Sequence, residues 1–159
     1  MIMNQDHNIY MQEAIAEAGK CSGSGDVPIG AVIVRNGGII ARGRNRIEET
    51  GDPTSHAEIE AIRKAVGVTD YKHLLECTIY VTLEPCAMCA GAIVLARLPL
   101  VVFGAFDPKA GACASLYEIA CDPRLNHRAE IIGGVLEEEC SILLKIFFKK
   151  IRDKKKTDG

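Results

Sequence analysis

The sequence has no hydrophobic run long enough to cross a membrane and no beginning typical of a secretory signal. Its apolar stretches fall well short of the roughly 20 residues that a membrane-spanning helix needs. Residues 1–10 lack the basic start and the following apolar stretch of a signal peptide. These absences argue against the membrane-spanning and secreted classes, and we expect a cytoplasmic protein.

Internal repeats and long linkers are also missing, so no feature of the sequence divides the chain into several domains. A length of 159 residues is that of one ordinary domain. Hydrophobic residues make up 48% of the chain and charged residues 25%, which is the balance of a folded globular protein rather than a disordered one. We therefore expect residues 1–159 to form a single domain.

A framework of disulfide bonds is not expected either. The chain contains seven cysteines, an odd number, which in a cytoplasmic protein indicates free thiols or metal ligands. One C-x-x-C pattern is present, at Cys86 and Cys89, and no second one exists to complete a four-cysteine zinc cage. The pair is then a thioredoxin-like redox pair, part of a structural zinc site, or part of a catalytic zinc site.

Short β-rich runs alternate with segments of helical pattern along the chain. The runs at 29–34 and 39–43 flank Asn36-Gly37-Gly38 and predict a hairpin. The other expected strands are 78–83, 101–104 and 131–134, and the expected helices are a first one ending near Gly19, then 56–65, 86–96 and 136 to beyond 152. This order predicts an α/β domain with a mixed sheet.

Two predicted helix starts carry residues that bind zinc. Cys86 and Cys89 follow Pro85, and the free N–H groups and dipole at a helix N-terminus favour the thiolate form that zinc needs. His56 stands at another helix start, after a polar loop. One histidine and two cysteines leave the fourth tetrahedral position to water, as in catalytic zinc sites. We predict that His56, Cys86 and Cys89 hold one zinc ion.

Glu58 allows a structural and a catalytic interpretation. Ser55 and Glu58 match the S-x-x-E capping box, in which the glutamate only satisfies a backbone N–H group. His56 and Glu58 followed by Pro85-Cys86 and Cys89 also match H-x-E with P-C-x-x-C, the signature of zinc nucleobase deaminases. In that case Glu58 takes a proton from the attacking water and returns it to a ring nitrogen of the base.

The stretches DPTSHAE at 52–58 and VTLEPCAMCAGA at 81–92 resemble the cytidine-deaminase-like superfamily. The segment 102–107 and Phe147-Phe148 are similar to its tRNA-editing branch. This resemblance implies a three-layer α/β/α fold with a five-stranded mixed sheet, a homodimer, and zinc-dependent deamination of adenosine to inosine. The implied substrate is the wobble adenosine in the anticodon loop of an arginine tRNA.

The resemblance also implies substrate contacts. Asn45 would contact the inserted nucleoside, and Asp107 would lie close to its neighbour in the loop. Backbone N–H groups near Ala57 and Cys86, both at predicted helix starts, would donate to the tetrahedral intermediate. Asn45 and Asp107 are equally common as turn residues.

The C-terminal segment is strongly basic. Residues 145–159 contain seven of the nineteen Lys and Arg residues and two Asp, a net charge of +5. Such a segment contacts a polyanion or is simply a solvated helix end. Helical spacing predicts a buried apolar stripe on this segment, with the members Leu136, Cys140, Leu143, Phe147 and Ile151. Phe148 either forms the edge of this stripe or stacks on an RNA base while Arg152 contacts phosphate.

Three alternatives to an RNA deaminase remain from the sequence. A deaminase of a free base or nucleoside, of the guanine or cytidine type, would share the zinc site. A structural zinc module would close the fourth metal position and show no turnover. A thiol oxidoreductase would use Cys86 and Cys89 without metal.

Overall fold

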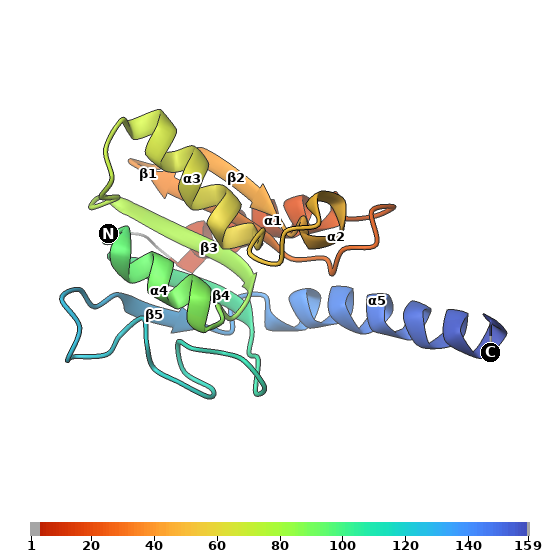
Figure 1. Ribbon diagram of the computed structural model, residues 1–159. Coiled ribbons are helices and arrows are strands. Elements are labelled where there is room, and N and C mark those ends of the chain that lie inside the picture. The colour runs from red at the N-terminus through yellow and green to blue at the C-terminus, as the bar shows by residue number, and fades with distance from the viewer. Residues whose placement is uncertain (1–3, 159) are drawn as a thin grey trace.

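A five-stranded sheet with the order β2-β1-β3-β4-β5 forms the centre of the computed structural model, which describes residues 4–158 (Figure 1). The hairpin consists of β1 (Gly30–Arg35) and β2 (Gly38–Arg44), and β1 also pairs antiparallel with β3 (Cys77–Leu83). β4 (Leu100–Ala105) and β5 (Glu130–Gly133) continue the sheet in parallel with β3. The mixed sheet is confirmed.

Helices cover both faces of this sheet, as Figure 1 shows. α3 (Ala57–Thr69) and α4 (Ala87–Leu95) pack on one face, and α1 (Asn4–Gly19) and the start of α5 (Glu137–Asp158) pack on the other. Neighbouring residues of a strand point to opposite faces: Ile79 joins the core under α3 and α4, while Tyr80 joins the core under α1. The three-layer α/β/α architecture predicted from the resemblance is therefore present.

The start of α3 lies directly on the backbone of β2. A Cβ atom at Gly43 would stand 2.3 Å from the carbonyl oxygen of Ala57 and 2.7 Å from the backbone nitrogen of Ala61. Because glycine has no side chain, the backbones of β2 and α3 are in direct contact here. This contact fixes the helix end that follows His56.

Two expectations about elements need correction. The loop after Asn45 contains a short helix, α2 (Ile47–Thr50), which its polar sequence did not indicate. The stripe on α5 is not buried as a whole, because only Cys140 is buried while Leu143, Phe147 and Ile151 are half-buried. α5 runs past the edge of the sheet, so its outer turns do not pack on the sheet (Figure 1). Among the described helices, none combines the length and apolar character needed to span a membrane.

Candidate active site

The three predicted metal ligands meet where two helices begin. His56 is the N-cap residue of α3, Cys86 is the N-cap residue of α4, and Cys89 lies one turn into α4. The Nδ1 atom of His56 is 3.6 Å from Sγ of Cys86 and 3.5 Å from Sγ of Cys89. All three ligand atoms lie within 4.8 Å of one another. The structure thus brings together residues that are separated by 30 positions in the sequence.

These distances can be compared with those around a zinc ion. Zn–S bonds of about 2.3 Å and Zn–N bonds of about 2.0–2.1 Å at a tetrahedral angle place sulfur and nitrogen about 3.5 Å apart. The observed 3.5 and 3.6 Å agree with this separation. Two cysteines and a histidine are also donors that zinc prefers. The residues present therefore fit a zinc ion with one position left for a small ligand.

The pKa values of the two cysteines in the cluster are shifted in opposite directions. The Cys89 thiol donates a hydrogen bond to the Cys86 sulfur, which lowers the pKa of Cys86 to about 4. The same bond and burial raise the pKa of Cys89. The hydrogen bond between His56 and Cys86 raises the pKa of His56. Metal binding requires the deprotonated ligands, so zinc would compete with protons for these three side chains.

Glu58 lies against this cluster and does not form a capping box. The N-cap residue of α3 is His56 rather than Ser55, and no side chain closes this helix start. Glu58 is therefore the second residue of the helix, one position too early for the capping role. Its side chain is only 4% exposed, and burial raises its pKa, while Cys89 stands within hydrogen-bond reach. Its carboxyl group is well placed to carry a proton beside the ligands.

Asn45 and Asp107 use their side chains to shape turns. Nδ2 of Asn45 donates to the carbonyl oxygen of Val27 at 3.2 Å, and its Oδ1 accepts from the backbone N–H of Ile47 at 3.4 Å. Oδ1 of Asp107 accepts from the backbone N–H groups of two residues in the loop after β4. Both residues hold the turn geometry that their residue types favour. Ala57, between His56 and Glu58, is fully buried at the first position of α3.

Phe148 and Arg152 lie on the outer part of α5, which runs away from the sheet. The structure does not bring them into the ligand cluster. Phe148 is 45% exposed and meets Phe147 edge to face at 5.3 Å, so it is not part of the core. Phe147 instead lines a groove of about 360 Å³ between α5 and residues 18–28.

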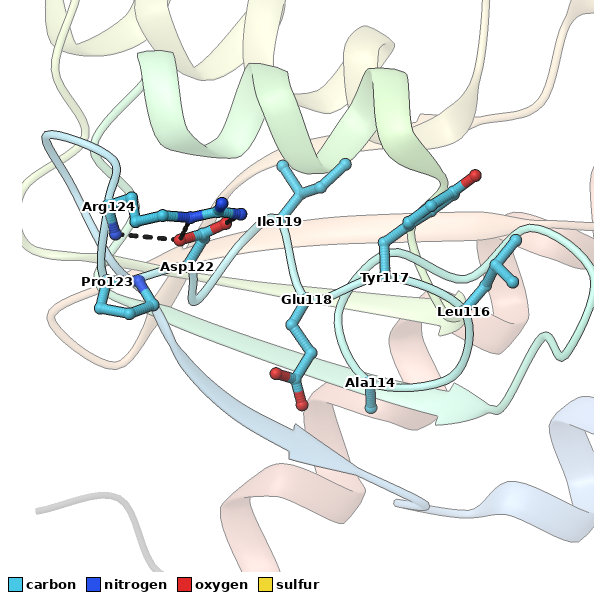
Figure 2. A pocket seen from close by; sticks show the side chains of 8 residues that line it. All are labelled: Ala114, Leu116, Tyr117, Glu118, Ile119, Asp122, Pro123 and Arg124. Atoms are coloured by element: carbon cyan, nitrogen blue, oxygen red, sulfur yellow. Dashed lines mark hydrogen bonds and ion pairs between the residues drawn. The ribbon is translucent and has the colours of Figure 1, made fainter.

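A second hollow, of about 560 Å³, lies along the loop between β4 and β5 (Figure 2). Tyr117 and Ile119 point toward α4 in this view, and Glu118 points to the opposite side. Arg124 contacts Asp122 through two guanidinium nitrogens, at 2.7 and 3.0 Å. This exposed ion pair lies at the turn where the chain begins its return to β5.

Sequence reasoning missed one residue of this region, Glu84. It follows β3 directly, is 2% exposed, and accepts hydrogen bonds from residues 107–115. Burial alone would raise the pKa of Glu84, but hydrogen bonds from Ser115 and from backbone N–H groups hold it below the usual range. The only signal in the sequence was a carboxylate between an apolar strand and Pro85.

Comparisons with known proteins agree with this site. The family model of MafB19-like deaminases matches residues 5–152. The tRNA-specific adenosine deaminase of Bacillus subtilis (strain 168) is 51% identical over 154 residues, which cover 97% of this chain and 95% of that protein. The tRNA-specific adenosine deaminase of Aquifex aeolicus is 45% identical, over 91% of this chain and 95% of its own.

Solved structures are similar as well. A structure from a study of A-to-I editing by tRNA:A34 deaminases at the wobble position of transfer RNA matches with a TM-score of 0.82 and 41% identity. The match covers 86% of this chain and 99% of that one. A guanine deaminase from Bacillus subtilis matches with a TM-score of 0.60 and 42% identity, over 63% of this chain and 64% of that one.

The fold and the ligand cluster together define a deaminase, and the protein is an enzyme of this class. The chain belongs to the MafB19-like deaminase family, in the group of the tRNA-specific adenosine deaminases that it matches along almost its whole length.

Proposed function

We propose that the protein catalyses the zinc-dependent hydrolytic deamination of adenosine to inosine at the wobble position of a tRNA anticodon loop, with an arginine tRNA as substrate. One observation carries the proposal. The cluster of His56, Cys86 and Cys89 beside buried Glu58 lies in a chain that matches tRNA-specific adenosine deaminases over nearly its full length.

The chain supplies the metal site and the proton carrier. His56, Cys86 and Cys89 would hold one zinc ion per chain, which when bound makes a water molecule more acidic. Glu58 would accept a proton from the attacking water as the water oxygen bonds to C6, and would deliver that proton to the ring nitrogen. It would then pass the remaining proton of the new hydroxyl to the departing amine, so that the C6–N bond breaks, ammonia leaves and adenosine becomes inosine. Burial raises the pKa of Glu58, and this favours proton uptake at that position. The backbone N–H near Ala57, at a helix start, would stabilise the negative charge that develops on the base.

We also propose how the RNA is held. An anticodon loop exposes unstacked bases, and a base must leave its stack to reach a buried carboxylate such as Glu58. Asn45 would contact the inserted nucleoside and Asp107 the region of its neighbour. Phe148 is exposed enough to stack on a base, and Arg152 lies one turn further along the same helix.

A homodimer in the cytoplasm, with residues 1–159 as one domain, completes the proposal. On α4, Met88 and Leu95 are 37% and 78% exposed, and Gly91 between them has open space around it. These three residues fall on one face of the helix, because they are three and four positions apart. An apolar helix face of this kind favours contact with a second copy of the same chain.

Mapping inosine in bacterial tRNA tests the reaction, the substrate and the position together. The zinc-loaded protein is incubated with total bacterial tRNA, and we expect inosine at the first anticodon position of arginine tRNA. The variant Glu58→Gln serves as the matched control. The similarity to a guanine deaminase makes a free base or nucleoside the second candidate substrate. Ammonia release from guanine, cytidine or adenosine without inosine in tRNA would favour that candidate.

A further inference from the structure

The buried carboxylate of Glu84 accepts hydrogen bonds from several residues of the loop that follows β4. Oε1 of Glu84 accepts from the backbone N–H of Asp107 at 3.1 Å and from the hydroxyl of Ser115. Oε2 accepts three backbone N–H groups, those of Cys113 at 3.2 Å, Ala114 at 2.8 Å and Ser115 at 2.9 Å. Among the ion pairs of residues 4–158, none involves Glu84. Backbone dipoles and one hydroxyl therefore balance its charge.

The same loop packs so tightly on Glu84 that there is no room for a side chain at Gly111. A Cβ atom at Gly111 would stand 2.3–2.5 Å from the carboxyl atoms of Glu84. Next to this contact, the backbone N–H of Ala112 donates to the carbonyl oxygen of Pro85 at 2.8 Å. Cys86, a member of the ligand cluster, follows Pro85 directly. The loop is thus attached to the segment that leads into the cluster.

We propose that Glu84 is a positioning residue that fixes Asp107 and residues 111–115 against the segment leading to Cys86, and so sets the wall of the site on which the substrate is placed. The proposal rests on the function proposed above for the identity of that substrate and for its placement beside Asp107. Both oxygens are needed, because Oε1 accepts from the backbone of Asp107 and from the Ser115 hydroxyl, while Oε2 accepts from the backbone of residues 113–115.

The variant Glu84→Gln separates these two roles. A glutamine has one acceptor oxygen, and facing it toward the three N–H groups of residues 113–115 leaves its NH₂ group toward Ser115 and Asp107. The Ser115 hydroxyl can rotate and accept a hydrogen bond, whereas the backbone N–H of Asp107 can only donate. The variant should therefore release Asp107 in particular. Ser115→Ala removes one donor and leaves Asp107 bonded, which makes it the matched control.

Amide hydrogen exchange of the zinc-loaded protein tests the positioning without reference to a substrate. We expect the amide of Asp107 to exchange at least ~10-fold faster in Glu84→Gln than in the wild type, because it loses its acceptor. The amide should be nearly unchanged in Ser115→Ala, and zinc content should stay at the wild-type level in both variants. Wild-type exchange at Asp107 in Glu84→Gln would overturn the proposal.

Deamination kinetics with an anticodon stem-loop RNA test the effect on substrate. We expect KM of Glu84→Gln to rise about tenfold, the size of one lost hydrogen bond to a charged group, while kcat changes less than about threefold. Gly111→Ala should shift KM in the same direction, because its methyl group displaces the carboxylate. Should Glu84→Gln only lower Tm and leave KM unchanged, Glu84 is merely structural. If the wild type leaves the RNA unmodified while Asp107 exchanges faster in the variant, the proposed substrate fails and the positioning role stands.

Discussion

His56 and Cys86 are the N-cap residues of two helices, and Cys89 lies one turn into α4. We expect His56→Ala, Cys86→Ala and Cys89→Ala each to lose zinc, from about one ion per chain to almost none, together with deamination. Metal analysis by mass spectrometry after gel filtration measures this. Zinc retained in full by all three variants would contradict the site.

Cys121→Ala is the matched control for these variants. Cys121 is half-buried, its sulfur lies within hydrogen-bond distance of the carbonyl oxygens of Cys113 and Glu118, and it is not a member of the ligand cluster. Its removal should leave zinc content and activity unchanged.

Glu58→Gln separates a proton carrier from a structural residue. Glutamine fills nearly the same volume but cannot exchange a proton, so we expect a folded, zinc-loaded protein whose deamination rate falls at least ~100-fold. Because burial raises the pKa of Glu58, the neutral side chain should keep or increase Tm. Glu60→Gln, two residues further on the same helix and paired with Arg46 at 3.5 Å, is the control and should stay active. Normal deamination by Glu58→Gln would refute the catalytic role.

At single residues, the sequence was informative where chemistry follows from local spacing. Cys86 and Cys89 lie one turn apart at a helix start, so they could be predicted to share a ligand. The capping-box interpretation of Ser55 and Glu58 fails by one residue, because the N-cap residue of α3 is His56 and not Ser55. Glu84 could not be predicted, since its hydrogen-bond partners lie 23 to 31 positions further along the chain.

Among the elements, α5 is the one whose packing differs most from its pattern. A helical stripe predicts which face is apolar, but whether that face is covered depends on how far the neighbouring layer extends. The sheet ends early along α5, so Phe147 and Ile151 line a groove instead of the core. Strands and helices with strong patterns, such as 78–83 in β3, could be predicted to within a few residues.

The exposed outer part of α5 leads to a prediction about RNA binding. Phe148→Ala should weaken tRNA binding by roughly 1–3 kcal/mol if the ring stacks on a base, with little change in Tm because the side chain is 45% exposed. Truncation after Phe148 should also reduce the salt dependence of binding, since fewer counterions are released. Fluorescence anisotropy at several salt concentrations measures both effects.

Phe147→Ala is the companion variant on this helix. Phe147 faces the groove against residues 18–28, so its loss should lower Tm more than it lowers RNA affinity. Unchanged affinity of the truncated protein at all salt concentrations would show that the basic end is only a solvated helix.

At the scale of the whole molecule, the strand order explains where the site forms. β3 and β4 are parallel, and α4 begins just after β3, so a helix N-terminus meets the carboxyl ends of two parallel strands. Alternating strands and helices made a parallel pair predictable. Residues 106–129 were not predictable, because they contain no helix or strand and are held by bonds to distant residues such as Glu84 and Leu98.

The bare contact between Gly43 and the start of α3 gives this helix one anchored end and one free end. A methyl group at Gly43 would push on Ala57 and lift the helix start from the sheet. Near the other end, Gly67 has open space around it and Val68 is 63% exposed. Changes of sequence and thermal motion can therefore accumulate at the distal end of α3, while the end that carries His56 tolerates almost none.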